Sequence, residues 1–290
     1  MGFDTTAILR APRPLSTGLK QLAGWVALCL LLIGIFSAWL FPYDRLQAWA
    51  LHHWHQRTGL RLTTDSWRFN WPLGFIAQSA TLTGPGVPRL EATRLSLQLS
   101  PSGLLQGAPT ITGTAGLRQA GSEPGAFSGR LTLGGWSWSH SASLTATLDR
   151  LDLSQFGWPS VSGGTVRITA DHRWDQADNS QAFIQGTGTW QFDGAGLTLR
   201  HVPLGAVALP QIRIDSMQAK LRCREGTCLV EEARGKGPDG SFVGAGVLAM
   251  RLPPADSVFD GEFTLSLAQP TPLSMRLKVA GPLSQLRVTF

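Results

Sequence analysis

Charge is scarce in this chain of 290 residues, of which only 15% are Asp, Glu, Lys or Arg. The 25 basic and 19 acidic residues give a net charge of +6, spread thinly along the chain and without a basic block. Proteins that bind nucleic acid cluster Lys and Arg on one face. The charge distribution therefore argues against nucleic acid as a partner.

Catalytic motifs are missing as well. The chain contains no G-x-S-x-G, no G-x-x-x-x-G-K-[ST] and no H-E-x-x-H, which are signals of hydrolases, phosphate-binding loops and zinc proteases. His52 and His55, three residues apart, are candidate metal ligands, but no nearby carboxylate supplies a third; imidazoles at a membrane surface are the favoured alternative. Asp171 and His172 point to opposite faces of a strand and form no dyad. We expect neither an enzyme, nor a cofactor, nor a metal site.

One long apolar run stands near the beginning of the chain. Leu22–Phe41 reads LAGWVALCLLLIGIFSAWLF and contains no charge. Because a helix rises about 1.5 Å per residue, this run covers the roughly 30 Å hydrocarbon core of a bilayer. The alternative, a cleaved signal peptide, has a shorter apolar region of about 7–15 residues and a small-residue cleavage site. We predict a retained transmembrane helix over residues 22–42.

The charges beside this run predict its orientation. Arg10, Arg13 and Lys20 precede it, and the adjacent Asp44 and Arg45 cancel after it. The excess of positive charge is typical of the cytoplasmic side. Residues 1–21 are therefore expected to be a cytoplasmic tail, and the rest of the chain to lie outside the membrane.

Residues 43–58 show helical spacing of apolar residues, at Leu46, Trp49, Ala50 and Trp54. Gly59 is a natural stop for such a helix. The pattern predicts a short amphipathic helix that lies along the bilayer surface.

From residue 59 the apolar period changes to two. Apolar and polar residues alternate, and Gly, Pro, Asn and Asp separate the segments, which is typical of half-buried antiparallel strands. The chain is thus predicted to be mainly β, with a long, curled antiparallel sheet over residues 59–290. A barrel, a sandwich and a trough all solve the closure of such a sheet, and curling into a trough needs the fewest additional elements. The clearest segments are 60–71, 90–100, 127–136, 142–153, 164–174, 183–192, 212–221, 242–252, 259–268 and 273–281.

Aromatic residues two apart share one face of a strand. Phe69 and Trp71 form one such pair, and Trp136 and Trp138 form another. We regard these four as candidates for lining an apolar groove, with ordinary core packing as the alternative.

The chain has three cysteines. Cys29 lies in the apolar run, whereas Cys223 and Cys228 bracket Arg-Glu-Gly-Thr. A tight hairpin at this tetrapeptide would place the two cysteines opposite each other, close to the geometry that a disulfide needs. In an oxidising compartment outside the membrane we expect the bond to form. Free thiols are the alternative, and a zinc site is disfavoured because no second ligand pair follows.

The order of these elements resembles a known family. After Phe41-Pro-Tyr-Asp44 come Trp71-Pro-Leu-Gly-Phe75 and TLTGPGVPRLEATRLSLQLSPSGLL, followed by DRLDLSQF, SGGTVRITAD, LPQIRIDSMQAKL and a terminal AGPLSQLRV. This order resembles the inner-membrane protein N of type II secretion systems, in its long form, over nearly the whole chain from about residue 20. More distantly, the chain is similar to the AsmA-like proteins, which combine an inner-membrane anchor with a β-rich periplasmic trough.

The resemblance implies a non-catalytic accessory component of the machinery that exports folded proteins. Its partners would be the lipid bilayer of the inner membrane and the other secretion components, and the family supplies no catalytic residue to carry over. The AsmA-like alternative implies an envelope protein that binds or conducts lipid acyl chains, with phospholipid as partner. In both cases the C-terminal domain is expected in the periplasm.

Overall fold

The computed structural model describes most of the chain from Tyr43 onward and seven residues before it. Two compact units divide the chain, Met1–Leu46 and Gln47–Phe290, and the sheet belongs to the second. The predicted cytoplasmic tail lies outside the described residues. Those described are 22, 24–26, 28–29, 32, 43–65, 67–70, 73–84, 87–118, 124–135, 141–156, 161–175, 186–204, 207–251, 256–268, 272–283 and 285–289.

Seven positions of the predicted transmembrane segment, 22–42, are described, and all seven are helical. Among the described residues, no helix has both the length and the apolar composition needed to cross a bilayer. The transmembrane helix therefore stays a prediction.

The predicted helix over residues 43–58 is confirmed as α2, Tyr43–Thr58. It ends before Gly59, whose N–H donates to the carbonyl oxygen of His55 at 2.9 Å. Trp49 and Trp54 leave 58% and 39% of their surface exposed. Exposed aromatic surface on a helix suits contact with a bilayer interface or a partner. The position of α2 along the bilayer surface stays a prediction.

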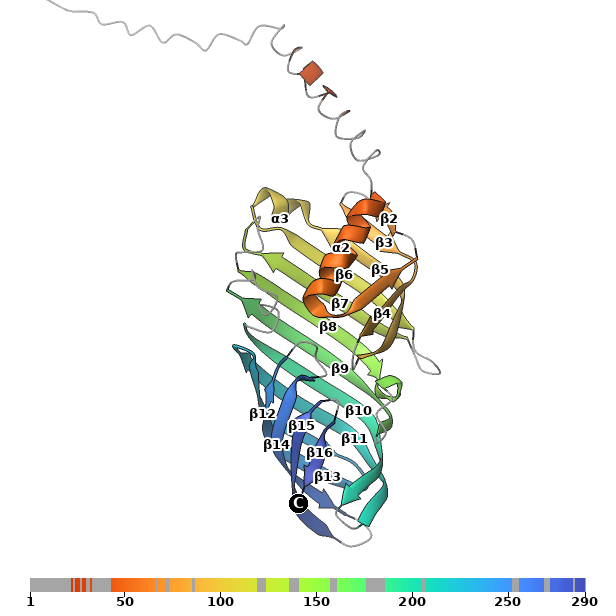
Figure 1. The fold of residues 1–290 in the computed structure, drawn as a ribbon, viewed down its shortest axis with the longest axis vertical. Coiled ribbons are helices and arrows are strands. Elements are labelled where there is room, and N and C mark those ends of the chain that lie inside the picture. Colours follow the sequence, from red (N-terminus) through yellow and green to blue (C-terminus); the bar gives the residue numbers. More distant parts are fainter. Residues whose placement is uncertain are drawn as a thin grey trace, which may run out of the picture. The chain divides into compact units, whose positions relative to one another are not determined.

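The described residues after α2 form one antiparallel sheet of sixteen strands. From β5 to β16, strands consecutive in the chain are neighbours in the sheet (Figure 1), while β3 and β4 both pair with β5. The first eight strands are β1 Arg61–Thr64, β2 Trp67–Asn70, β3 Gly74–Ala77, β4 Ala80–Gly84, β5 Val87–Leu99, β6 Thr110–Arg118, β7 Gly125–Leu133 and β8 Ala142–Asp152. The others are β9 Val161–Trp174, β10 Thr187–Leu204, β11 Val207–Arg224, β12 Thr227–Lys236, β13 Gly240–Ala249, β14 Val258–Leu267, β15 Leu273–Pro282 and β16 Arg287–Thr289.

Within the part of the meander that the structure describes, two short helices lie between strands. Helix α3, Pro101–Leu105, joins β5 to β6, and the hydroxyl of Ser100 caps it by accepting from the N–H of Gly103. The 3₁₀ helix η1, Leu153–Phe156, joins β8 to β9 and packs against β9 and β5.

Along two strands the apolar residues switch between even and odd positions of the sequence, and a bulge at each switch keeps them on one face of the sheet. In β8 the register with β9 shifts between Leu148 and Leu151, and Arg150 adopts a φ of 53° there. In β12 the register with β13 shifts between Val230 and Ala233. An extra residue in one strand turns the following side chains over, so each bulge returns the apolar residues to the same side of the sheet.

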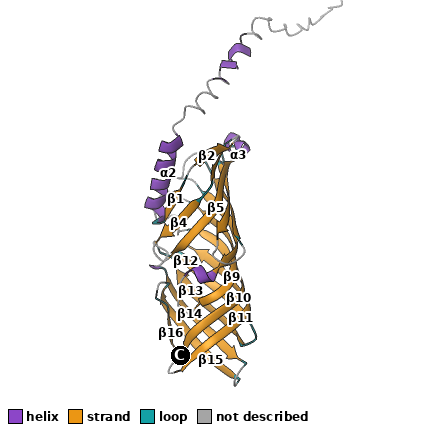
Figure 2. Ribbon diagram, turned by 90° about the vertical axis from the view of Figure 1, so that its right-hand side faces the viewer, coloured by secondary structure: helices purple, strands orange, loops and turns teal. Residues whose placement is uncertain are grey.

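The largest core cluster joins strands that are not neighbours in the sheet. Ile212 and Ile214 of β11 lie in one buried cluster with Leu265 of β14, although two strands separate β11 from β14 in the sheet order. Figure 2 accordingly draws β13, β14 and β16 on the side opposite β9, β10 and β11. Ile214 keeps only 1% of its surface exposed. The C-terminal strands thus bury their apolar face against the middle strands.

These observations confirm the mainly β prediction and the single large antiparallel sheet. The sheet is not closed, because β1 and β16 stand at opposite ends of the strand order and do not pair among the described residues.

Candidate functional site: the apolar inner face

The face of the sheet that carries the core cluster is here called the inner face. Its clearest feature is one row of directly paired residues that crosses eleven strands, from β5 to β15, without a polar side chain. The register places these residues opposite one another in the order Leu95, Ala115, Phe127, Leu148, Ile168, Phe192, Ala219, Ala233, Gly244, Phe263 and Leu277.

The neighbouring row on the opposite, outer face is polar throughout. It runs from β5 to β12 through Ser96, Thr114, Ser128, Thr147, Thr169, Gln191, Lys220 and Glu232. Over these eight strands, alternation therefore separates an apolar row from a polar one.

The large residues of the apolar row remain partly exposed in both halves of the sheet. Leu148 of β8 does so, and so do Ile168 of β9 and Phe192 of β10. Buried inner-face residues also occur in both halves, such as Leu117 of β6 and Ile212 of β11. The apolar row is thus partly accessible on both sides of β9.

His172 is the only described titratable residue on the inner face that is fully buried. It lies on β9 with 2% of its surface exposed, and its ring stands 4.8 Å from that of Trp174 and 6.4 Å from that of Trp190, measured between centroids. Burial lowers the pKa of His172 below the ordinary 6.5, and the neighbouring Asp171 opposes this only in part. Burial therefore favours the neutral form of the imidazole.

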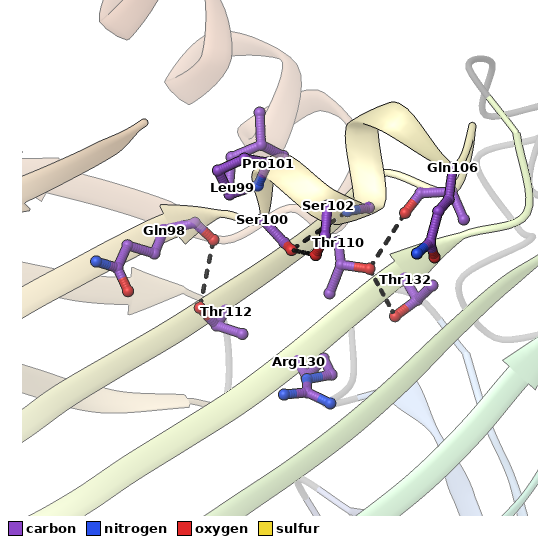
Figure 3. A pocket seen from close by; sticks show the side chains of 12 residues that line it. Gln98, Leu99, Ser100, Pro101, Ser102, Gln106, Thr110, Thr112, Arg130 and Thr132 are labelled. Carbon is purple, nitrogen blue, oxygen red and sulfur yellow. Dashed lines mark hydrogen bonds between the residues drawn. The ribbon is translucent and has the colours of Figure 1, made fainter. Parts of the chain in front are cut away.

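The outer face carries a polar hollow of about 600 Å³ beside α3 (Figure 3). Among the described residues that line it, Arg130 is the one with a charged side chain. Several surrounding hydroxyls already bond to protein atoms: that of Thr112 donates to the carbonyl oxygen of Gln98 at 3.3 Å, and Ser100 and Ser102 share a hydrogen bond of 2.9 Å. The hollow is an open polar surface, in contrast to the inner face.

The predicted disulfide is confirmed. Cys223 and Cys228 pair across β11 and β12, with their sulfur atoms 1.99 Å apart. Glu225 and Gly226 form the turn between them with φ values of 49° and 82°. Two central residues with positive φ make the tight hairpin turn in which Gly is favoured at the second position. Both cysteines lie in a buried cluster with Leu221.

The four predicted groove-lining aromatics are not placed in a site. Trp71, Trp136 and Trp138 lie outside the described residues. Phe69 belongs to β2 and pairs in register with Phe75 of β3, and the position of its side chain is not described. The residues of the inner row were missed as site residues, although period-two alternation was the signal that could have found them.

No group of three potential metal ligands occurs among the described residues. The side chain of His52 hydrogen-bonds to that of Gln56 at 2.8 Å, and Nδ1 of His55 lies 3.4 Å from the carbonyl oxygen of Leu60. The imidazoles of His52 and His55 thus have local protein contacts.

Comparison with known proteins gives no relative: no protein-family model, curated protein or solved structure matches the chain. The functional argument therefore depends on the residues and on their arrangement.

Proposed function

We propose that this protein is an inner-membrane accessory component of a type II secretion system. Its N-terminal segment would anchor it with the N-terminus in the cytoplasm, and its periplasmic sheet would act by binding other components, not by catalysis. The observation that carries this proposal is the order of the short motifs along nearly the whole chain, from Phe41-Pro42 to the terminal AGPLSQLRV. A meander with a polar outer face supports it, because such a surface is suited to recognition.

Genomic context and crosslinking test this proposal. We expect genes for a secretion ATPase, a secretin and pseudopilins beside this gene, and crosslinks from the outer face to their products in cells. Neighbouring genes of envelope biogenesis together with no crosslink to any secretion component would refute it. Loss of secretion in a deletion strain is a weaker readout, since accessory components can be dispensable.

A second candidate function is the binding of lipid acyl chains along an AsmA-like trough. The observation that favours it is the apolar row across eleven strands, whose large residues, such as Phe127 and Leu148, stay partly exposed. Exposed apolar surface is costly in water at about 25 cal/mol per Å². An acyl chain laid along this row would cover it.

Extraction of the purified protein tests the second candidate. The full chain is isolated in a detergent that mass spectrometry distinguishes from native lipids. We expect acyl lipid to remain bound in a defined ratio, and replacement of Leu95 and Phe127 by Asn to remove it. The matched control replaces Ser96 and Ser128, their neighbours on the outer face, by Asn. Equal lipid contents in both double variants would contradict the proposal.

A further inference from the structure

We infer that His172 and Trp190 form a polar subsite on the inner face that binds the carbonyl oxygen of an acyl-chain ligand, as a carboxyl group or an ester. This inference rests on the second candidate function, the binding of acyl chains, and names the head group that such a chain carries.

The geometry of two neighbouring strands brings these side chains together. In the register of β9 with β10, His172 lies opposite Gly188, and Trp190 lies opposite Ala170. The two rings are thus diagonal neighbours on the inner face, with centroids 6.4 Å apart and planes at 86°. Both belong to the surface that the apolar row crosses at Ile168 and Phe192.

Three nitrogen atoms of this pair are buried and have no hydrogen-bond partner in the protein: Nδ1 and Nε2 of His172 and Nε1 of Trp190. Trp67 shows the contrasting case, since its Nε1 donates to the hydroxyl of Thr64 at 2.6 Å. A buried polar group without a partner costs about 1–3 kcal/mol, so native proteins rarely keep one without a reason. Two such residues side by side on an apolar face point to a partner that the protein itself does not supply.

The chemistry of the three nitrogens defines this partner. The indole of Trp190 is a donor only, and the neutral imidazole of His172 has one donor and one acceptor. A carbonyl oxygen has two lone pairs and can accept from both N–H groups. The apolar surroundings suit the alkyl chain that a carboxyl or ester group of a lipid carries.

Two glycines allow this arrangement. A Cβ atom at Gly188 would stand 2.6 Å from Nδ1 of His172, and one at Gly186 would stand 2.6 Å from its Nε2. A larger residue at either position would also crowd the backbone carbonyl oxygen of Asp171 or Arg173. The alternation Gly186-Thr-Gly188-Thr-Trp190 therefore fits β10 to the imidazole and leaves its nitrogens uncovered by side chains from these two positions.

The test uses the full chain, delipidated in detergent, and three probes with the same chain length: dodecanoate, methyl dodecanoate and dodecane. Affinity is measured by displacement of a fluorescent fatty acid. In parallel, ¹⁵N spectra of labelled histidine and tryptophan follow the ring nitrogens of His172 and Trp190 in the wild type during each titration, so that the result does not depend on a variant folding.

The variants are His172→Leu and Trp190→Phe, with His53→Leu and Trp67→Phe as matched controls. We expect each of the first two to weaken binding of dodecanoate about tenfold, which corresponds to one lost hydrogen bond of about 1.4 kcal/mol, and to leave dodecane unchanged. Both controls should bind all probes like the wild type. Methyl dodecanoate distinguishes an ester from a free acid. Whichever of methyl dodecanoate and dodecanoate binds more weakly to His172→Leu and Trp190→Phe than to the wild type identifies the head group.

Three outcomes would overturn the inference. If dodecane and dodecanoate weaken equally in His172→Leu, the residue contributes packing only. If the ring nitrogens of the wild type do not shift with dodecanoate although the chain binds, the subsite holds a water molecule alone, and the acyl-binding function survives without it. If no probe binds the wild type, the acyl-binding function itself fails.

Discussion

Removal of the Cys223–Cys228 disulfide should lower the free energy of unfolding by an amount that depends on the length of the loop that the disulfide closes. The two cysteines are five positions apart in the chain. For so short a closed loop, the entropy that the crosslink removes from the unfolded chain corresponds to about 2 kcal/mol at 25 °C. For a domain of this size, that loss lowers the melting temperature by about 4–8 °C.

The assay is thermal unfolding of the full chain in detergent, followed by far-UV circular dichroism. The double variant Cys223→Ala, Cys228→Ala keeps small apolar side chains in the buried cluster, and wild type reduced before unfolding tests the crosslink without a substitution. Cys29→Ala is the matched control, because Cys29 is an exposed free thiol. We expect reduction to destabilise the wild type and Cys29→Ala alike.

The reasoning fails if the double variant melts at the wild-type temperature. It also fails if reduction lowers the melting temperature of the double variant as much as that of the wild type. Thiol labelling of unreduced protein gives an independent check, since it should mark neither Cys223 nor Cys228.

Three further predictions concern stability. Ile214 has 1% of its surface exposed in the main cluster, and Ile214→Ala should lower the free energy of unfolding by about 2–5 kcal/mol in denaturant unfolding. Val243 is 55% exposed, and Val243→Ala should change this free energy by less than about 0.5 kcal/mol. Similar values for both variants would contradict the assignment of the two residues to opposite faces. Because burial lowers the pKa of His172, this side chain takes up a proton at a higher pH in the unfolded state than in the folded state. The free energy of unfolding should therefore fall as the pH drops below the ordinary pKa of 6.5, by at most about 1.4 kcal/mol per pH unit. His172→Leu should remove this pH dependence, and the same slope in the variant would refute the prediction. Gly164→Ala should cost more than about 1 kcal/mol, since Gly164 has a φ of 118° and its Cβ would lie 2.8 Å from the Cα of Leu197. Gly163→Ala, with no atom within 4 Å of its Cβ, is the control and should be neutral.

The alternation of side chains predicted much of the sheet, because one face of each strand is apolar and the other polar. It failed for β12, which was not among the predicted segments. There the apolar residues change parity between Val230 and Ala233, and Glu231 and Glu232 stand between them. A bulge interrupts the alternation of apolar and polar residues, so a pattern with a constant period of two does not predict this strand.

β6 was missed for a different reason. Its inner residues Gly113 and Ala115 are so small that the segment resembles a turn in composition, and only Ile111 and Leu117 carry a clear signal. Such small residues can be assigned to the inner face only when their partners on the neighbouring strand β7 are known. Gly113 pairs with Gly129, and Ala115 pairs with Phe127.

The candidate site was less predictable than the fold. The disulfide followed from local sequence, because a two-residue turn with Gly226 fixes which residues face each other. The pair of His172 and Trp190 lies 18 residues apart in the chain and meets only through the register of β9 with β10. The lack of partners for their nitrogens depends on every surrounding atom, which no pattern in one strand can reveal.

Photo-crosslinking from two adjacent residues of β7 is the sharpest test of whether the inner face is the surface that binds lipid. A photoreactive amino acid is placed at Phe127, on the inner face, or at Ser128, on the outer face, in the full chain in native bacterial membranes. We predict lipid adducts by mass spectrometry from position 127 and none from position 128. Lipid adducts from both positions alike, or from neither, would contradict this prediction.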